Sequence, residues 1–274
     1  MLVLLTNDDG IGAAGLHALR RALGAVDGLE TRVIAPNSNR SATARSITTR
    51  TPLSVEEIEF DDGEVGYATD GTPVDCVRFA DLGLGGQRPD LILSGINHGL
   101  NLGDDITYSG TVAAAFEGIV LGIPAIAVSQ QSTGGEMDFR FGRDFDFSAS
   151  ARLTAALVGQ LAGTPLPEGT LLNVNCPGVP PEGIEITRLG KRVYQDELRL
   201  VHEDDAGRRS YRIYGFAPTF EDEPGTDLSA LARGCVSLTP VHFDLTDRPG
   251  LDRLRDWDLG PVLRAARDGA SAAP

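Results

Sequence analysis

The chain begins with Met1 and continues as Leu2-Val3-Leu4-Leu5-Thr6-Asn7-Asp8-Asp9-Gly10, a segment that sets its fold class. Residues 2–6 form a short, nearly continuous apolar run, which is typical of a strand buried on both faces of a sheet. After a turn, Leu16, Leu19 and Leu23 recur at the spacing of one helix face. The segment therefore predicts a strand–turn–helix unit that opens an α/β domain, with two carboxylates at the carboxyl end of the strand.

The alternation of strand and helix continues to residue 181. Further buried strands are predicted at residues 31–35, 91–94, 125–129 and 171–175, and helices at residues 74–84, 112–121 and 147–161. Asp62-Gly63 predicts a hairpin between residues 52–60 and 65–69. This order predicts a Rossmann-like parallel sheet sandwiched by helices, and we assign residues 1–181 to that catalytic core.

The pattern changes beyond residue 181, and residues 182–274 are predicted to form a smaller C-terminal portion. A hairpin is expected from residues 197–202 and 209–216, followed by a short helix at 227–234 and a strand at 235–240 that can return to the core sheet. The Ala-rich tail from Ala265 is expected to fray.

Composition limits the classes of function. The formal net charge of −15 argues against a non-specific nucleic-acid binder, which needs a surplus of Lys and Arg. Cys76, Cys176 and Cys235 stand far apart, which fits buried reduced thiols better than disulfides or a zinc site. The apolar opening is too short for a signal peptide, and no apolar run reaches the ~18 residues of a membrane span. We expect a cytoplasmic protein without membrane or nucleic-acid partners.

Oxygen-bearing side chains follow three of the predicted strands. Residues 7–10 read Asn-Asp-Asp-Gly, residues 36–41 read Pro-Asn-Ser-Asn-Arg-Ser, and residues 95–101 read Gly-Ile-Asn-His-Gly-Leu-Asn. In open α/β sheets, ligands bind outside the carboxyl ends of the strands. The three loops are therefore expected to meet at one edge and to form the site.

Asp8 and Asp9 are the first candidates for chemistry in that site. Adjacent carboxylates repel each other, and the repulsion grows where water is excluded. A hard divalent cation such as Mg²⁺ or Mn²⁺ removes that cost, and it prefers oxygen ligands such as carboxylates, a Ser hydroxyl and an Asn carbonyl. The alternative is that the pair only shapes the turn or caps the next helix.

Ser109-Gly110-Thr111 stands at the start of the helix predicted from residue 112. Free backbone N–H groups and hydroxyls at a helix N-terminus form a seat for an anion such as phosphate. Taken alone, Ser109 fits an ordinary helix cap better. Beside a metal site, the phosphate seat becomes the preferred interpretation.

The segment Gly10-Ile11-Gly12-Ala13-Ala14-Gly15 matches a dinucleotide-binding pattern and supports an alternative, a non-catalytic nucleotide- or dinucleotide-binding module. Asp8 and Asp9 directly precede it, however, where a pyrophosphate would meet two negative charges. The acidic residue expected after the second strand is also missing, since Ala35-Pro36-Asn37 stand there. An aspartate-nucleophile phosphatase is disfavoured because the D-x-D-x-T pattern is absent.

The chain closely resembles the SurE family of metal-dependent nucleotidases, from Leu2 to about Thr246. The resemblance rests on LLTNDDG (residues 4–10), the stretch from residue 35 to 48, GTPVDCV (71–77), SGINHGLNLGDD (94–105), YSGTVAAA (108–115), LNVN (172–175), GTD (225–227) and VSLTP (236–240). Ala42 stands where the family usually has Gly, and Arg45 occupies a position that is more often small or polar. Both lie in the loop that carries Ser41.

The resemblance implies one divalent ion per subunit, Mg²⁺ or Mn²⁺, on Asp8, Asp9, Ser41 and Asn97. It implies hydrolysis of nucleoside 5′- and 3′-monophosphates, and of short polyphosphate in some members. It also implies a homodimer or homotetramer that exchanges the C-terminal hairpin or tail.

For the reaction, we expect Ser109, Gly110, Thr111 and Asn97 to hold the phosphate, with Asp8 and Asn101 as the catalytic residues. In-line attack by water is the leading hypothesis, and a phospho-aspartate on Asp8 stays open as an alternative.

Overall fold

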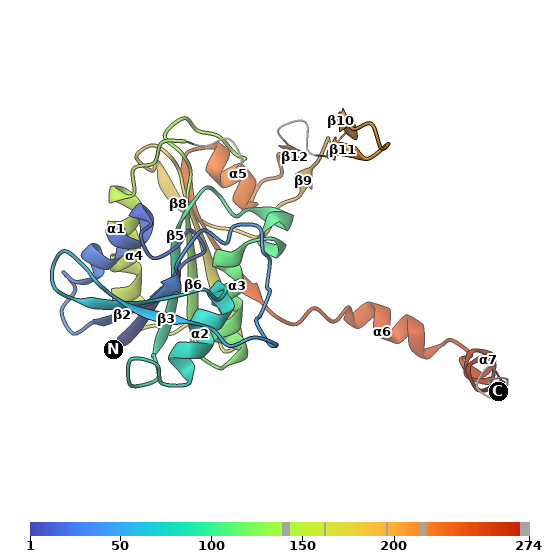
Figure 1. The fold of residues 1–274 in the computed structure, drawn as a ribbon, viewed down its shortest axis with the longest axis horizontal. Coiled ribbons are helices and arrows are strands. Elements are labelled where there is room, and N and C mark those ends of the chain that lie inside the picture. Colours follow the sequence, from blue (N-terminus) through green and yellow to red (C-terminus); the bar gives the residue numbers. More distant parts are fainter. Residues whose placement is uncertain (139–142, 162, 196, 214–217, 269–274) are drawn as a thin grey trace. The chain divides into compact units, whose positions relative to one another are not determined.

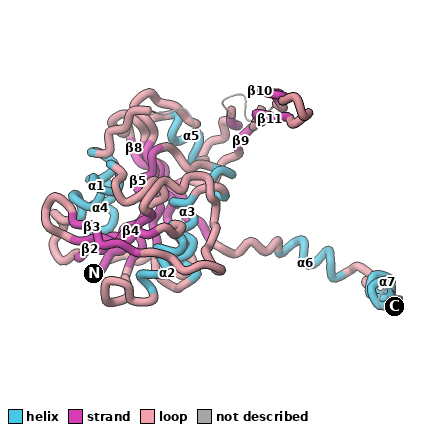
Figure 2. The backbone as a smooth tube through the Cα atoms, viewed as in Figure 1, coloured by secondary structure: helices cyan, strands magenta, loops and turns pink. Residues whose placement is uncertain are grey.

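A mostly parallel sheet, with nine strands among the described residues, runs through the centre of residues 1–243 (Figures 1 and 2). Its spatial order is β3-β4-β2-β1-β5-β6-β7-β13-β8. The strands are β1 (Leu2–Thr6), β2 (Glu30–Pro36), β3 (Val55–Glu59), β4 (Val65–Thr69), β5 (Leu91–His98), β6 (Ala125–Gln130), β7 (Thr170–Cys176), β8 (Gly183–Ile186) and β13 (Cys235–His242). The predicted α/β class with a Rossmann-like parallel sheet is confirmed.

The computed structural model describes residues 1–138, 143–161, 163–195, 197–213 and 218–268. The helices in residues 1–243 are α1 (Ala14–Leu23), α2 (Pro73–Asp81), the 3₁₀ helix η1 (Gly103–Thr107), α3 (Gly110–Val120), α4 (Ser148–Leu161) and α5 (Asp227–Ala232). None of the helices in the described ranges is long and apolar enough to cross a membrane.

Helices cover both faces of the sheet, as the continuous apolar sequence of β1 predicts. Val3 and Leu5 point to the face covered by α1 and α4, where they share a buried cluster with Leu16 of α1. Leu4 points to the opposite face and joins the cluster beneath α2 and α3. Strands buried on both sides are apolar at successive positions, so the continuous run at residues 2–5 follows directly from the two-layer cover.

The chain reverses its direction across the sheet at β1. From β1 it proceeds through β2 to β4 on one side, and it then returns to β5 on the other side of β1. Such a reversal opens a crevice at the carboxyl ends of the two central strands. Asp8 follows β1, and Asn97 lies at the end of β5, so the topology itself brings them to the same crevice.

The glycines of the Gly10–Gly15 pattern serve packing and turn geometry. A Cβ atom at Gly15 would lie 2.0 Å from the backbone oxygen of Ile96, so the glycine allows α1 to approach β5 closely. Gly10 has φ +103°, a left-handed conformation that favours glycine in the turn after β1. The pattern is thus explained without a bound dinucleotide.

Within the predicted C-terminal portion, β13 lies inside the main sheet, antiparallel to β7 and parallel to β8. The predicted hairpin is observed as β10 (Arg199–Glu203) and β11 (Arg209–Arg212), and all residues of these two strands are exposed. Its second strand was expected to reach residue 216, and residues 214–217 lie outside the described residues. A further small sheet joins β9 (Arg192–Val193) to β12 (Thr219–Phe220). The functional division at residue 181 stays a prediction.

Residues Asp244–Pro274 form a separate unit with α6 (Arg248–Arg255) and α7 (Gly260–Asp268). Neither helix was expected from the sequence, although Pro249 suits the first turn of α6. Both helices leave large apolar side chains exposed, among them Leu254 of α6 and Leu263 of α7, and Trp257 between the two helices is exposed as well. The tail was expected to fray from Ala265, but residues 265–268 belong to α7, and residues 269–274 lie outside the described residues.

Candidate metal and phosphate site

Asp8 lies at the bottom of the crevice, with only 3% of its surface exposed. The turn that carries it is held by Asn7, whose side-chain Nδ2 donates to the Gly10 oxygen (2.9 Å) and whose Oδ1 accepts from the Gly10 N–H (3.2 Å). The backbone oxygen of Asp8 accepts a bond from the Arg40 N–H at 2.6 Å. The first and second loops are therefore joined at Asp8.

The carboxylate of Asp8 is in an unfavourable electrostatic environment. Burial, and to a smaller extent the negative charge of Asp9, raise the pKa of Asp8 to about 6. The hydroxyl of Thr111 donates to Asp8 Oδ1 and partly offsets this rise. A cation bound beside Asp8 would stabilise the charged form of its carboxylate and lower its pKa.

Asp9 is turned toward a neighbouring pocket of about 470 Å³. Its Oδ2 accepts from the backbone N–H of His98 (3.0 Å) and lies 2.8 Å from His98 Nδ1. The amide of Asn39 donates to the other oxygen at 3.3 Å. The first, second and third loops thus meet at Asp9, as the sequence predicts, but the carboxylate lies beside the Asp8 pocket rather than inside it.

A small pocket of about 40 Å³ collects most of the predicted site residues. Asp8, Ser41, Asn97, Asn101 and Ser109 all line it. About 10–15 Å³ of such space holds one water molecule, so the pocket has room for an ion with a few waters. The structure therefore brings polar side chains from four separate segments to one small cavity.

The two asparagines of the third loop are held rigidly. Asn97 Nδ2 donates to the Gly99 oxygen at 2.8 Å, which commits the amide nitrogen and leaves the carbonyl oxygen as its ligand end. Asn101 Nδ2 donates to Ser129 Oγ at 2.7 Å, and its backbone N–H donates to Asn175 Oδ1 at 2.9 Å. These bonds come from β6 and β7, so the sheet itself fixes Asn101 in the pocket.

The N-terminus of α3 lies against Asp8. Ser109 caps the helix by accepting from the Val112 N–H at 3.1 Å, and a Cβ atom at Gly110 would lie 2.8 Å from the Asp8 Cβ. Thr111 is fully buried and its hydroxyl is bonded to Asp8. In this structure Thr111 supports the carboxylate, and its direct contact with phosphate stays a prediction.

Asp105 and Tyr108 also line the pocket, and sequence reasoning gave neither a role. Asp105 accepts a bond from the buried Arg192 Nε at 2.9 Å and another from the Tyr194 hydroxyl. The available signal was the position of Asp105 in the motif at residues 94–105. Its partners are more than eighty residues away in the sequence, so the pairing itself carried no local signal.

The donor set favours a hard cation. Asp8, Ser41 and Asn97 offer a carboxylate, a hydroxyl and an amide oxygen in one pocket, with a second carboxylate at its border. In the part of the chain that the structure describes, His, Cys, Asp and Glu nowhere gather in a group of three or more that could hold a metal. An all-oxygen site with water in the remaining positions suits Mg²⁺ or Mn²⁺ better than zinc.

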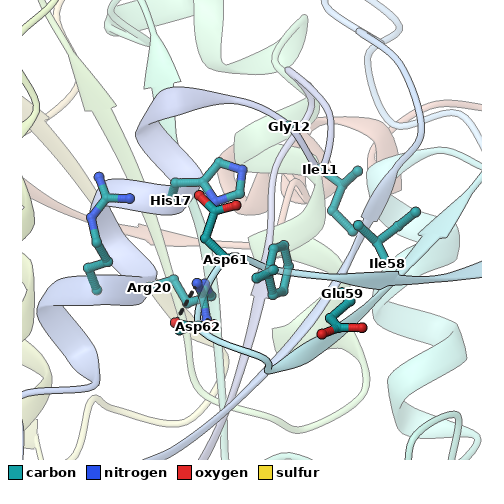
Figure 3. A pocket seen from close by; sticks show the side chains of 10 residues that line it. Ile11, Gly12, His17, Arg20, Ile58, Glu59, Asp61 and Asp62 are labelled. Carbon is teal, nitrogen blue, oxygen red and sulfur yellow. Dashed lines mark hydrogen bonds and ion pairs between the residues drawn. The ribbon is translucent and has the colours of Figure 1, made fainter.

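A larger pocket of about 430 Å³ lies between α1 and the β3–β4 hairpin (Figure 3). Arg20 is bound there by Asp62 at 2.7 Å and stacks on Phe60 at 4.2 Å, and His17 packs edge-on against the same ring. None of the predicted site residues lines this pocket. It is separate from the small pocket that Asp8 lines. Its ion pair and ring contacts pack the β3–β4 hairpin against α1.

Fold and pocket together define an α/β protein with a buried carboxylate and a helix N-terminus at the switch point of a parallel sheet. The family model "Survival protein SurE" matches residues 3–196. Two curated relatives called 5′-nucleotidase SurE are similar to this chain. The relative from Rubrobacter xylanophilus is 55% identical over 268 residues (96% of this chain, 99% of the relative), and that from Symbiobacterium thermophilum is 44% identical over 264 residues (94% and 98%).

The crystal structure of the SurE protein from Aquifex aeolicus is similar as well. It has a TM-score of 0.78 and 38% sequence identity, and the match covers 93% of this chain and 100% of that protein. The chain belongs to the SurE family.

Proposed function

We propose that this protein is a divalent-metal-dependent phosphomonoesterase that hydrolyses nucleoside 5′-monophosphates to nucleoside and phosphate. The observation that carries the proposal is the buried Asp8, whose pKa is raised by burial and by Asp9, directly beside the N-terminus of α3. The buried carboxylate of Asp8 would be stabilised by a cation, and the N-terminus of α3 can bind an anion such as phosphate. The relatives named 5′-nucleotidase SurE supply the class of substrate.

Asp8, Asp9, Ser41 and Asn97 are the residues that would hold the metal. A divalent ion bound there would supply charge neutralisation and a more acidic water. Asp8 is kept in place by Thr111, and Asp9 by His98 and Asn39. Ser41 lies on an exposed loop, so its approach depends on how that loop is held.

The phosphate would be seated against the first turn of α3. The N–H groups of Gly110 and Thr111 lie in the first turn of α3, where no backbone oxygen of the helix can accept from them. Ser109 orders this end of the helix by accepting a bond from the Val112 N–H. Asn101 is rigid and borders the same pocket, which suits it to position the phosphate or the attacking water. Catalysis would rest on positioning and electrostatics, as is usual in phosphoryl transfer.

Phosphate release from a panel of nucleotides tests the proposal. We expect nucleoside 5′-monophosphates to be hydrolysed with Mn²⁺ or Mg²⁺ and to be inert after treatment with chelator, with activity returning when metal is restored. Nucleoside 3′-monophosphates and short polyphosphate in the same panel define the range of substrates. Full activity in excess chelator would contradict the proposed metal dependence.

Self-association is also proposed, with the hairpin and the C-terminal unit as the contact surfaces, in a cytoplasmic protein. Leu200, Val201 and Tyr211 of the hairpin and Trp257 and Leu263 of the tail are large apolar side chains that are exposed in a single chain. Scattered exposed apolar side chains are ordinary, but sets of them on separate extended elements are typical of interaction surfaces.

The double variant Trp257→Asp/Leu263→Asp is expected to lower the molar mass measured by light scattering, because charges would be placed in an apolar contact. Leu82→Asp, which changes an exposed leucine at the end of α2, is the matched control and should leave the mass unchanged. An unchanged mass in the double variant would exclude the tail as an essential contact.

A further inference from the structure

The loop from Asn37 to Ser46 carries Ser41 and contains two alanines in the left-handed conformation. Ala42 has φ +58° and Ala44 has φ +51°. Residues with a Cβ rarely adopt such angles, and the conformation persists only where surrounding contacts hold it. The contacts that hold this loop are therefore of functional interest.

The N-terminal part of the loop is fixed by backbone bonds. The Asn37 N–H donates to the Thr69 oxygen at 2.7 Å, and the Arg40 N–H donates to the Asp8 oxygen at 2.6 Å. The Arg40 side chain donates from Nη2 to the Asp70 oxygen at 2.7 Å. These contacts precede Ser41, and within the left-handed segment the Thr43 hydroxyl donates to the Arg40 oxygen at 2.7 Å. The contacts at the other end of the loop join it to α2 and α3.

At the C-terminal end, Thr72 Oγ1 donates to the Ser46 oxygen at 2.9 Å, and Arg45 joins the loop to α3. Its Nη2 lies 2.7 Å from Glu117 Oε2, and its guanidinium stacks on the ring of Phe243 at 4.6 Å. Glu117 belongs to α3 and its side chain is only 1% exposed, so the carboxylate that Arg45 contacts is shielded from water. A further backbone bond runs from the Ala44 N–H to the Tyr108 oxygen at 3.2 Å.

Arg45 does not act as a phosphate-binding charge in this arrangement. Its partner Glu117 lies about 10 Å along α3 from Gly110, at 1.5 Å per residue, and so two turns from the anion seat. The Arg45 guanidinium, which contacts Glu117 and stacks on Phe243, therefore lies at the middle of α3 and not at its N-terminus. Its effect on the site must pass through the loop.

We propose that Arg45 is a positioning residue that latches the Ser41 loop to α3. By pairing with Glu117 it holds the Ala42–Ala44 segment in its left-handed conformation and so keeps Ser41 beside Asp8. The consequence for metal binding rests on the proposed function, whereas the order of the loop does not.

Glu117 supplies a matched control, because its second oxygen Oε1 pairs with Arg78 Nη2 at 2.6 Å. Arg78 lies on α2 and has no part in the loop. Arg45→Ala and Arg78→Ala each remove one cation from the same buried carboxylate. Both variants therefore disturb Glu117, but only the first releases the loop.

The experiment combines amide hydrogen exchange of the metal-free protein with calorimetric titration of Mn²⁺ and steady-state kinetics. In Arg45→Ala we expect exchange at residues 37–46 to be at least about tenfold faster, the Mn²⁺ Kd and the KM to rise about tenfold, and kcat to change less. In Arg78→Ala we expect wild-type values for all of these, even if the melting temperature falls. Arg45→Lys, which retains one charged contact, should lie between wild type and Arg45→Ala and serves if Arg45→Ala does not fold.

Wild-type loop exchange in Arg45→Ala would overturn the latch, as would equal effects of the two alanine variants on the loop. A wild-type protein that neither binds Mn²⁺ nor releases phosphate would instead refute the proposed function, and the exchange measurement would still test the latch. Faster loop exchange in Arg45→Ala with an unchanged Mn²⁺ Kd would refute the step from the loop to the metal.

Discussion

Asp8→Asn is expected to lower metal-dependent phosphate release by about 10³-fold or more. Two carboxylates line the small pocket beside α3, and Asp105 is already paired with Arg192. The substitution removes the other one, Asp8, and with it the charge that would bind a divalent ion. Several kcal/mol of lost stabilisation in the transition state corresponds to a loss of this size. Phosphate release at saturating Mn²⁺ measures it.

The same substitution is expected to stabilise the metal-free protein at neutral pH. The pKa of Asp8 is raised from 3.8 to about 6, first by burial and then by the charge of Asp9. A carboxyl with a raised native pKa favours folding below its unfolded pKa, and this contribution is lost as the pH rises through the native value. A shift of two pKa units corresponds to about 3 kcal/mol in the free energy of unfolding. Wild type loses this stability as Asp8 ionises, whereas the asparagine variant has no carboxyl to ionise.

Urea unfolding in chelator at pH values from 4 to 8 tests this. The free energy of unfolding of Asp8→Asn relative to wild type should increase by up to about 3 kcal/mol across that range. Adding Mn²⁺ should stabilise wild type and not the variant. Asp61→Asn, which changes an exposed carboxylate, is the control. Parallel pH profiles for wild type and Asp8→Asn would show that Asp8 is not under electrostatic strain.

Gly110→Ala is expected to reduce activity by about 10²-fold while the protein stays folded. A Cβ atom at Gly110 would lie 2.8 Å from Asp8 Cβ and 2.9 Å from Asp8 Oδ2, so the carboxylate must move. A displacement of about 1 Å in a catalytic group can cost this much. Alanine is the better helix former, so α3 itself should not be weakened. Phosphate release and the melting temperature, measured together, separate the two effects.

Gly159→Ala provides the control for a glycine-to-alanine change in a helix. A Cβ atom at Gly159 in α4 would have nothing within 4 Å, so we expect stability to rise by up to ~1 kcal/mol with no change in activity. Wild-type activity in Gly110→Ala would mean that the position of Asp8 relative to α3 does not matter for the reaction.

Much of the core could be predicted because its signals are local. The apolar run at residues 2–5 and the helical spacing of Leu16, Leu19 and Leu23 correspond to β1 and α1 as observed. The expectation that loops after parallel strands meet at one edge of the sheet predicted that Asp8 and Asn97 lie close together, and both line the same pocket. The strand order, and with it the switch point beside β1, was not predicted. The roles assigned to these residues in the site stay predictions.

What could not be predicted depends on contacts between distant segments. The Arg45–Glu117 pair joins residues 72 apart, and the Arg192–Asp105 pair joins residues 87 apart. A charged residue in a loop has the same local pattern whether it is solvated or paired with a buried partner. Helices α6 and α7 were missed for a different reason, since they leave their apolar side chains exposed in a single chain.

Anomalous diffraction from a crystal of the protein soaked with Mn²⁺ tests the metal site directly. We expect one peak per subunit, about 2.1 Å from oxygen ligands that include Asp8 and Asn97, with Asp9 and Ser41 in or next to the coordination sphere. The peak should be lost in Asp8→Asn. A protein that releases phosphate from nucleotides, yet shows no manganese between these side chains, would contradict a metal site at the carboxyl end of β1.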